Sequence, residues 1–180
     1  MKFGLWFEPE MISPDSDLYR EHPDWAIHID EREGVQSRNQ MVLDLSRDEV
    51  CEYVINAVSD ILANANIEYV KWDMNRQLTD MPRLGYNHEY TLGYYKIMSA
   101  ITEKFPNILF EGCSAGGGRF DAGVLAYMPQ IWTSDNSDAI ARLKMQYSTS
   151  MCYPVYSISS HVTASVSYTH LRAHETELHL

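Results

Sequence analysis

Apolar residues along the chain follow two spacings, one typical of buried strands and one typical of amphipathic helices. Short apolar runs without helical spacing predict strands at residues 3–7, 67–72, 108–110, 131–133 and 155–162, with a further run at 40–45. Branched and aromatic side chains dominate these runs, and such side chains pack well on a pleated surface. Helical spacing predicts helices that begin at about residues 46, 89, 121 and 139 and end at about residues 64, 105, 128 and 152.

Strands therefore alternate with helices at least four times, and polar residues follow the strands. This order predicts an α/β fold with a parallel sheet and right-handed crossovers. A (β/α)8 TIM barrel is favoured over a doubly wound sheet, because no nucleotide-binding glycine fingerprint follows the first strand. Since a full barrel takes about 250 residues, we expect residues 1–165 to form an incomplete (β/α)8 catalytic domain.

Residues 166–180 do not continue this pattern, because they show neither periodicity nor a recognisable turn pattern. The segment resembles translated adapter read-through at the end of a metagenomic contig, so we expect a non-native tail that is a sequencing artefact. His170, His174 and His179 lie in it, but their arrangement does not indicate a metal site.

Several single residues allow two interpretations. Ser46 with Glu49 three residues later is a capping box that predicts a helix start. Glu8 and Glu10 follow the first strand; either could face a site, but for Glu10 we favour an exposed loop position. Trp25, in a long polar segment, is either a sugar platform or packed against its own loop.

Composition narrows the class of protein. A net charge of -11 and a pI near 4.9 argue against nucleic acid and anionic lipid as partners. The three cysteines, at 51, 113 and 152, form neither a disulfide framework nor a zinc ribbon, and they indicate a reducing compartment. No apolar run is long enough for a membrane span, and the first residues lack the features of a signal peptide. We therefore expect a cytoplasmic bacterial protein.

A polar cluster at the end of the apolar run 67–72 is the strongest candidate site. Lys71, Asp73 and Asn75 alternate there and would share one face of a strand. Barrel enzymes build active sites at the carboxyl ends of buried strands, so this arrangement favours catalysis. A structural ion pair at a strand end is the alternative.

Five motifs then occur in a fixed order over residues 1 to about 164. They are Trp6-Phe7-Glu8-Pro9-Glu10-Met11, Ser37-Arg38-Asn39-Gln40, Lys71-Trp72-Asp73-Met74-Asn75-Arg76, Glu111-Gly112-Cys113-Ser114 with Gly116-Gly117-Gly118-Arg119, and Trp132-Thr133-Ser134-Asp135-Asn136-Ser137-Asp138. The set resembles the catalytic domain of glycoside hydrolase family 36 α-galactosidases. That family also has an N-terminal β-sandwich, a first barrel strand with paired aspartates and a C-terminal β-domain, so the resemblance covers roughly the second to seventh barrel strands.

The resemblance implies a retaining hydrolase that acts on galactosyl oligosaccharides of the melibiose and raffinose type. Asp73 would be the nucleophile and Asp135 the general acid/base. The galactose subsite would be lined by Trp6, Arg38, Lys71, Trp72, Asn75, Cys113 and Gly116, although Cys113 could also be a small filler at a strand end. The resemblance implies no metal and no cofactor, and it implies a parent enzyme that assembles as a homo-tetramer.

The chemistry of the two aspartates agrees with these roles. Retaining hydrolysis needs one ionised and one protonated carboxyl group about 5–5.5 Å apart. Lys71 beside Asp73 should favour the ionised form, and Asp138 near Asp135 should favour protonation of one of that pair. Asp138 is the rival for the acid role and also a plausible helix N-terminal residue.

Three alternative functions stay open. An α-N-acetylgalactosaminidase or a transgalactosidase related to raffinose synthase would use the same machinery. A non-catalytic sugar-binding module is disfavoured, because it has no need of two intact carboxylates.

Overall fold

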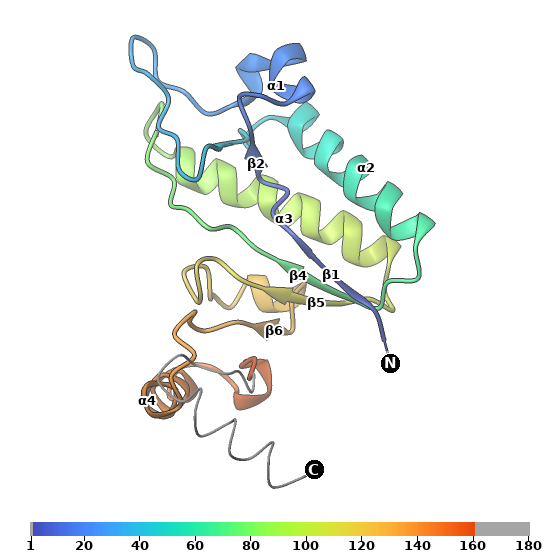
Figure 1. Cartoon of the computed structure of the whole chain (residues 1–180), viewed down its shortest axis with the longest axis vertical. Helices are drawn as coiled ribbons and strands as arrows, with labels where there is room; N and C mark the ends of the chain where they lie inside the picture. The colour runs from blue at the N-terminus through green and yellow to red at the C-terminus, as the bar shows by residue number, and fades with distance from the viewer. Residues whose placement is uncertain (1, 161–180) are drawn as a thin grey trace, which may run out of the picture.

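The computed structural model describes residues 2–160, and its strands and helices are arranged as Figure 1 shows. In chain order they are β1 (Gly4–Phe7), β2 (Met11–Ile12), α1 (Asp17–Glu21), the 3-10 helix η1 (Pro23–Trp25), β3 (Met41–Val42), α2 (Asp48–Asn64), β4 (Tyr69–Trp72), α3 (Tyr86–Lys104), β5 (Leu109–Gly112), η2 (Val124–Ala126), β6 (Gln130–Ile131), α4 (Ala139–Ser150) and η3 (Val155–Ser157). Residues 166–180, with the three histidines named above, lie outside the described part of the chain.

The four strands β1, β4, β5 and β6 form one parallel sheet in that order. The register places Trp6, Lys71 and Glu111 side by side on neighbouring strands. Parallel strands end at the same edge, so the residues that follow each strand gather there. The predicted α/β fold with a parallel sheet is therefore confirmed.

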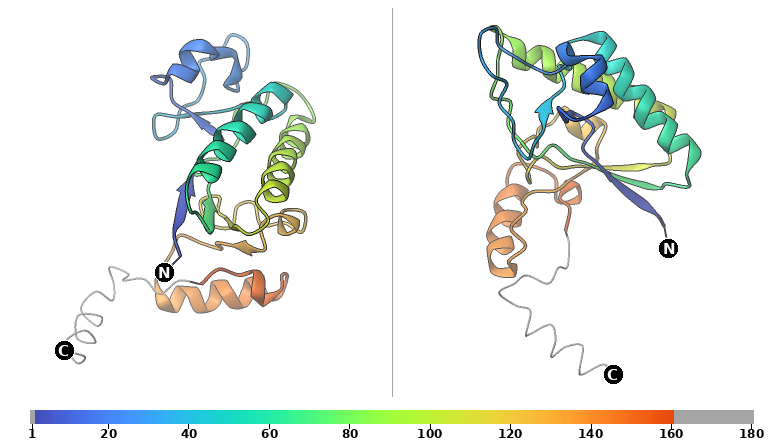
Figure 2. Two further views of the ribbon diagram at one scale, coloured as in Figure 1. Left: turned by 90° about the vertical axis from the view of Figure 1, so that its right-hand side faces the viewer. Right: turned by 45° about the horizontal axis from the view of Figure 1, so that its top comes forward.

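Helices α2 and α3 run side by side over one face of the sheet, whereas α4 lies beyond β6, away from them (Figures 1 and 2). The core forms between these two helices and the sheet. Its largest fully buried side chains include Trp72, Phe110, Ile97 and Met98. Gly93 lets α3 approach closely, because a Cβ there would lie 1.8 Å from the carbonyl oxygen of Leu45.

The first strand differs from its prediction in burial. Residues 4–7 of the predicted run 3–7 form the strand β1, but Phe3 before it is 58% and Trp6 within it 50% exposed. In the described part of the chain β1 pairs only with β4. A strand at a sheet edge has a neighbour on one side only, so its side chains keep more contact with water.

The apolar run 40–45 contributes a strand outside the parallel sheet. Its residues Met41–Val42 (β3) pair antiparallel with β2. The helix after it begins at Asp48 rather than Ser46, and the predicted capping box is wrong. The Ser46 hydroxyl donates to Asp44 Oδ1 at 2.6 Å, and Glu49 binds Arg47 instead.

The remaining differences lie at helix surfaces and near the end of the described residues. The helix expected at 121–128 is only the short η2, and one apolar residue on each of α2 and α3, Ile61 and Leu92, is 44% and 53% exposed. The strand expected at 155–162 begins as η3 and then makes one parallel bridge, from Ile158 to Ile131. Residues 161 and 162 lie outside the described part.

None of the helices within residues 2–160 combines the length and apolar character needed to cross a membrane.

Candidate active site

The candidate site lies where β1, β4, β5 and β6 end. Asp73 directly follows β4, and its backbone N–H donates to the Phe7 carbonyl of β1 at 2.9 Å. Cys113 directly follows β5, and its N–H donates to the Trp72 carbonyl at 2.8 Å. The polar residues predicted from the sequence are thus held at one edge by hydrogen bonds that continue the sheet.

The two carboxylate oxygens of Asp73 have different surroundings. Oδ2 accepts from Trp6 Nε1 at 3.1 Å and from Asn75 Nδ2 at 2.7 Å. Oδ1 is buried and accepts no hydrogen bond from any described residue. Asp73 is 5% exposed overall. The side chain is therefore fixed through one oxygen, whereas the other is buried without a hydrogen-bond donor among the described residues.

Glu8 organises the residues beside Asp73. Its Oε1 accepts from the Asn75 side chain at 2.7 Å, from the Asn75 backbone N–H at 3.2 Å and from Arg38 Nη1 at 3.1 Å. Arg38 and Asn39 both have left-handed backbones, with φ of 55° and 58°, in a two-residue turn closed by hydrogen bonds between Ser37 and Gln40. Non-glycine residues rarely adopt this conformation, and strained turns of this kind cluster at functional sites.

Lys71 has a different partner from the predicted one. Its Nζ lies 3.2 Å from Glu111 Oε1 and 4.6 Å from the centroid of the Trp132 ring. The sheet register explains this, because Lys71 and Glu111 are direct neighbours on β4 and β5. Glu111 also accepts from Tyr69 and Ser159, both at 2.5 Å. The expected pairing of Lys71 with Asp73 is corrected accordingly.

Cys113 is 4% exposed and lies against Asp73. Burial, with a further contribution from the Asp73 carboxylate, raises the pKa of the Cys113 thiol to about 12. The group is therefore a neutral thiol at physiological pH, suited to packing or to a weak hydrogen bond and unsuited to nucleophilic attack.

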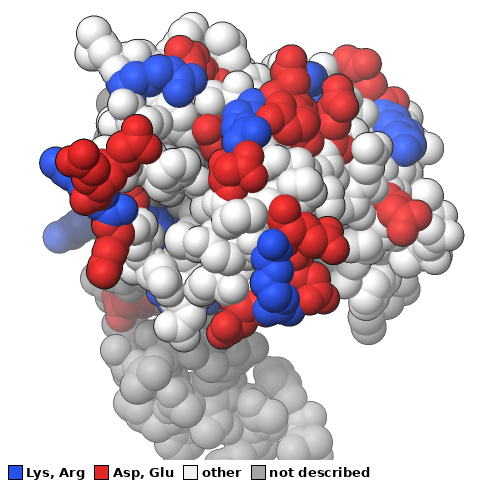
Figure 3. Space-filling model, turned by 90° about the horizontal axis from the view of Figure 1, so that it is seen from above, with Lys and Arg blue, Asp and Glu red and all other residues white. Residues whose placement is uncertain are grey.

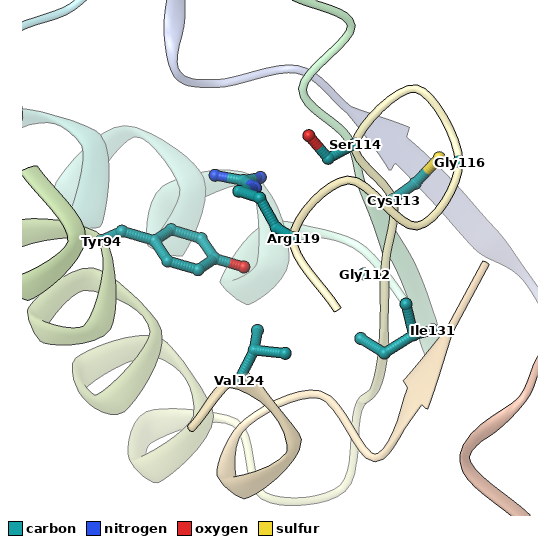
Figure 4. Close-up of a pocket in the computed structure, with 8 residues that line it drawn as sticks. All are labelled: Tyr94, Gly112, Cys113, Ser114, Gly116, Arg119, Val124 and Ile131. Atoms are coloured by element: carbon teal, nitrogen blue, oxygen red, sulfur yellow. The ribbon is translucent and has the colours of Figure 1, made fainter. Parts of the chain in front are cut away.

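The glycine-rich loop follows β5 and packs against the loop that carries Asp135, with the Gly117 N–H donating to the Thr133 carbonyl at 3.1 Å. Gly116 has φ of +90°, and a Cβ there would lie 2.8 Å from Ser134 Cα. Beneath this loop is a cavity of about 10 Å³, lined by Tyr94, Cys113 and Arg119 among others (Figure 4). Such a volume is close to what one water molecule needs.

Asp135 and Asp138 have separate partners. Asp135 Oδ1 accepts from Trp132 Nε1 at 2.9 Å. Asp138 is the N-cap of α4, and its Oδ1 accepts from the Ala141 N–H at 2.8 Å. The alternative position of Asp138 at a helix N-terminus is therefore confirmed, which leaves Asp135 as the carboxylate with no capping role.

Two residues lie deeper than the sequence suggested. Trp72 is fully buried, and its Nε1 donates to Glu10 Oε1 at 2.9 Å, so we do not retain it as a sugar contact. Glu10 is fully buried as well, and the expectation of an exposed loop glutamate is wrong. Arg119 pairs with Glu10, and the Tyr90 hydroxyl donates to Glu10 at 2.7 Å. Glu10 belongs to the motif at residues 6–11 and Arg119 to the glycine-rich motif at 116–119. Membership of these motifs was the only sign in the sequence that the two residues have a structural role.

Trp25 packs against nearby residues of the chain, which agrees with the second of the two interpretations given for it. Its ring stacks on His22 with centroids 4.0 Å apart and meets the edge of Tyr53 at 5.5 Å. This stacking occupies part of the ring surface that a sugar platform would need.

A groove of about 790 Å³ begins beside Asn75. Its lining includes Arg76, Thr79, Asn87 and Ser114. Arg76 also donates to the carbonyls of Val35 and Gln40, both at 2.9 Å, and so holds the base of the Arg38 turn.

The described residues form no metal site, and the face of the molecule in Figure 3 has no basic patch. Within residues 2–160 no group of three or more His, Cys, Asp or Glu side chains is arranged to hold a metal ion. On the face in Figure 3, acidic and basic side chains are interspersed, and acidic ones are prominent. This face has no basic patch of the kind that binds nucleic acid.

Comparison with known proteins decides the family. The sequence model of the family described as Melibiase matches residues 1–180. The chain belongs to the Melibiase family. Within it, the resemblance to glycoside hydrolase family 36 α-galactosidases is confirmed by relatives in both sequence and structure.

Two of these relatives, one of them compared in both sequence and structure, show how close the match is. α-Galactosidase AgaA of Geobacillus stearothermophilus is 54% identical over 172 residues, covering 91% of this chain and 24% of AgaA. α-Galactosidase C of Emericella nidulans is 50% identical over 164 residues, covering 91% of this chain and 22% of that protein. The AgaA crystal structure superposes with a TM-score of 0.88 at 53% identity, covering 92% of this chain and 24% of that one.

Two further AgaA structures contain oligosaccharides. A doubly substituted variant, with one aspartate replaced by alanine, is in complex with stachyose, at a TM-score of 0.88, 53% identity and coverage of 92% and 24%. Another variant, with an aspartate replaced by asparagine, is in complex with raffinose, at a TM-score of 0.87, 53% identity and coverage of 91% and 24%. The chain thus spans about a quarter of AgaA's length.

Proposed function

We propose that the full-length protein containing this chain is a retaining α-galactosidase. It would hydrolyse terminal α-D-galactosyl residues of melibiose- and raffinose-type oligosaccharides. The observation that carries the proposal is the asymmetric environment of Asp73, with Oδ2 held by Trp6 and Asn75 and Oδ1 without a hydrogen bond among the described residues. A carboxylate nucleophile has to be held in a fixed orientation, and the two hydrogen bonds to Oδ2 supply this.

In the first step, the Asp73 carboxylate attacks the anomeric carbon while the bond to the glycosidic oxygen breaks. Asp135 donates its proton to that oxygen, so the leaving group departs as a neutral alcohol. In the second step, Asp135 takes a proton from water, and the water oxygen displaces Asp73. Two inversions at the same carbon give net retention.

The positions of the two aspartates support this assignment. Asp73 follows β4 and Asp135 follows β6, with β5 between them. Neighbouring strands lie about 4.8 Å apart, so the two strand ends are about 10 Å apart. Retention requires the two carboxyl groups to lie about 5–5.5 Å apart, so the proposal requires the Asp73 and Asp135 side chains to approach each other across the end of β5.

We further propose that the sheet is part of a (β/α)8 barrel that the rest of the protein completes. The described residues supply four parallel strands and a bridge at Ile158, fewer than the six strands expected from the sequence. Residues 1–165 would then be part of one catalytic domain, and residues 166–180 would not belong to it.

Three further expectations belong to the whole protein. AgaA variants bind stachyose and raffinose, which supports galactosyl oligosaccharides as substrates here. The apolar side chains exposed on α4, among them Leu143 at 68% and Tyr147 at 70%, would be covered in a complete, homo-tetrameric enzyme. Free Cys51, Cys113 and Cys152 support a cytoplasmic location.

The stereochemistry of the first product tests the mechanism. We would follow hydrolysis of p-nitrophenyl α-galactoside by the full-length protein with proton NMR. Appearance of the α-anomer of galactose before the β-anomer is expected, whereas β-galactose as the first product would exclude Asp73 as a nucleophile. The rate on p-nitrophenyl α-N-acetylgalactosaminide distinguishes the galactosaminidase alternative, and transfer to sucrose distinguishes the transgalactosidase alternative.

The acid role of Asp135 has its own test. Asp135→Asn should abolish turnover of raffinose, whose leaving group needs a proton. It should affect turnover of p-nitrophenyl α-galactoside less, because p-nitrophenolate leaves without one. Equal losses on both substrates would contradict the role.

A further inference from the structure

Glu8 is the carboxylate closest in the hydrogen-bond network to Asp73, and the proposed mechanism gives it no role. It follows β1 directly, and its side chain is 9% exposed. Glu8 is linked to Asp73 only through the Asn75 side chain. Glu8 is therefore a candidate for holding Asp73 in place rather than for reacting with the substrate.

The amide of Asn75 lies between two carboxylates. Its Nδ2 is 2.7 Å from Glu8 Oε1 and 2.7 Å from Asp73 Oδ2. An amide nitrogen has two N–H groups, one for each acceptor. The opposite orientation would place the amide oxygen against two carboxylate oxygens, all of them acceptors. The two carboxylates together therefore fix which way Asn75 points.

Glu8 fixes the backbone of Asn75 as well. The Asn75 N–H donates to the same Oε1 at 3.2 Å, and Arg38 Nη1 lies 3.1 Å from it. The guanidinium offsets the negative charge of Glu8, which would otherwise lie near Asp73 without compensation. This arrangement lets a second carboxylate stand close to the nucleophile.

We propose that Glu8 is a positioning residue that locks the Asn75 amide, so that the Asp73 carboxylate is held through Oδ2 in the orientation required for attack. This inference rests on the proposed function of Asp73. Without Glu8, the Asn75 amide is free to rotate, and Asp73 loses one of the two donors that fix its carboxylate. The galactosyl carbon would then face a nucleophile in several orientations.

A double-mutant cycle in the full-length protein tests the proposal. Glu8→Met keeps the side-chain volume and removes the acceptor, Asn75→Ala removes the amide, and Glu8→Gln keeps an oxygen acceptor. Asp30→Asn, at a side chain that is 98% exposed, is the control for loss of one negative charge. Each variant is assayed for kcat and KM on p-nitrophenyl α-galactoside, with the folded fraction measured by circular dichroism.

We expect Glu8→Met to lower kcat about 10- to 100-fold, as a misplaced reacting group does, with little change in KM. Asn75→Ala should have a similar effect, and the double variant should be no slower than the slower single variant, because both remove one shared contact. Glu8→Gln should recover most of the loss. A purely structural role would lower the folded fraction and leave kcat per folded molecule unchanged.

Losses that multiply in the double variant, or a rise in KM without a fall in kcat, would overturn the proposal. If Glu8→Met does not fold, the Glu8→Gln variant tests the proposal instead. A kcat near that of the wild type supports Glu8 as the hydrogen-bond acceptor for Asn75, and a loss as large as that of Asn75→Ala contradicts it. Failure of the proposed function is seen separately, since Asp73→Gly would then show no rescue by azide whatever the outcome of the cycle.

Discussion

Glu10 and Arg119 form an ion pair inside the domain, with Arg119 Nη1 2.8 Å from Glu10 Oε1 and 2.9 Å from Oε2. Glu10 follows β1 and Arg119 ends the glycine-rich loop, so the pair ties together two segments that carry site residues. Burial alone would lower the pKa of the Arg119 guanidinium, but the nearby Glu10 carboxylate raises it above its ordinary value. Arg119 is therefore charged at any pH at which the protein folds.

Breaking this pair should destabilise the protein strongly. Arg119→Met leaves the fully buried Glu10 carboxylate without its partner, which costs about 3–5 kcal/mol. Glu10→Leu should cost less, because the Arg119 side chain is 25% exposed and its charge keeps contact with water. The double variant Glu10→Leu with Arg119→Met should be less destabilised than either single variant, because no charge is left buried. Thermal unfolding of the full-length variants measures this, and a double variant less stable than both singles would contradict the account.

Gly116 should be the most sensitive glycine of the site loop. Gly116→Ala combines the unfavourable φ of +90° with a Cβ 2.8 Å from Ser134 Cα, so the loop before Asp135 must move. We expect kcat to fall about 100-fold, as for a 1 Å misplacement of a catalytic group.

Gly85 provides the matched control for Gly116. It has a similar φ of +81°, but a Cβ there would meet nothing within 4 Å. Gly85→Ala should cost about 1–2 kcal/mol of stability and leave kcat unchanged. Equal effects of the two substitutions on kcat would show that backbone strain, rather than contact with the Asp135 loop, accounts for the loss.

Alkaline pH should destabilise the folded protein. Burial raises the pKa of Cys51 to about 11 and that of Cys113 to about 12, and it also raises the pKa values of Tyr86 and Tyr90. The unfolded state releases these protons first, from about pH 8.5 for cysteine, so stability is complete below that pH and is lost as pH rises toward the folded values. The midpoint of urea unfolding should fall from about pH 9 upward.

Cys51→Ala serves as the check on this pH dependence, because it removes one of the groups with a raised pKa. The variant should lose less stability between neutral and alkaline pH than the wild type does. A midpoint that is constant across this range in both proteins would contradict the account.

The 180-residue chain alone should be unstable and inactive. Its α4 exposes Ile140 at 59%, Leu143 at 68% and Tyr147 at 70%, and β1 exposes Trp6 at 50%. These apolar surfaces and the open strand edge favour association over a stable monomer. We expect no cooperative thermal transition in the purified chain, and a cooperative transition together with galactosidase activity would contradict this.

Strand and helix identities could be predicted because periodicity reports local structure. The runs at 67–72 and 108–110 became β4 and β5, and helical spacing located α2, α3 and α4 within a few residues. Burial of the first strand could not be predicted, since it depends on which strand lies beside it. The misplaced capping box has a similar cause, because Asp44 competes for the Ser46 hydroxyl.

The candidate site was predictable where sequence spacing carried the geometry. Asp73 and Asn75, two residues apart, do meet at 2.7 Å. Lys71 was paired with the wrong carboxylate, because its neighbour Glu111 lies 40 residues away and is set by strand register. The burial of Glu10 needed contacts from three further segments, and no local pattern reports such contacts.

The assignment of Asp73 as nucleophile is the central claim, and azide rescue tests it most directly. Asp73→Gly in the full-length protein should lose nearly all activity on p-nitrophenyl α-galactoside. Azide should restore turnover by entering the space of the missing carboxylate, and the product should be β-galactosyl azide. Near wild-type activity of Asp73→Gly without azide would contradict the account.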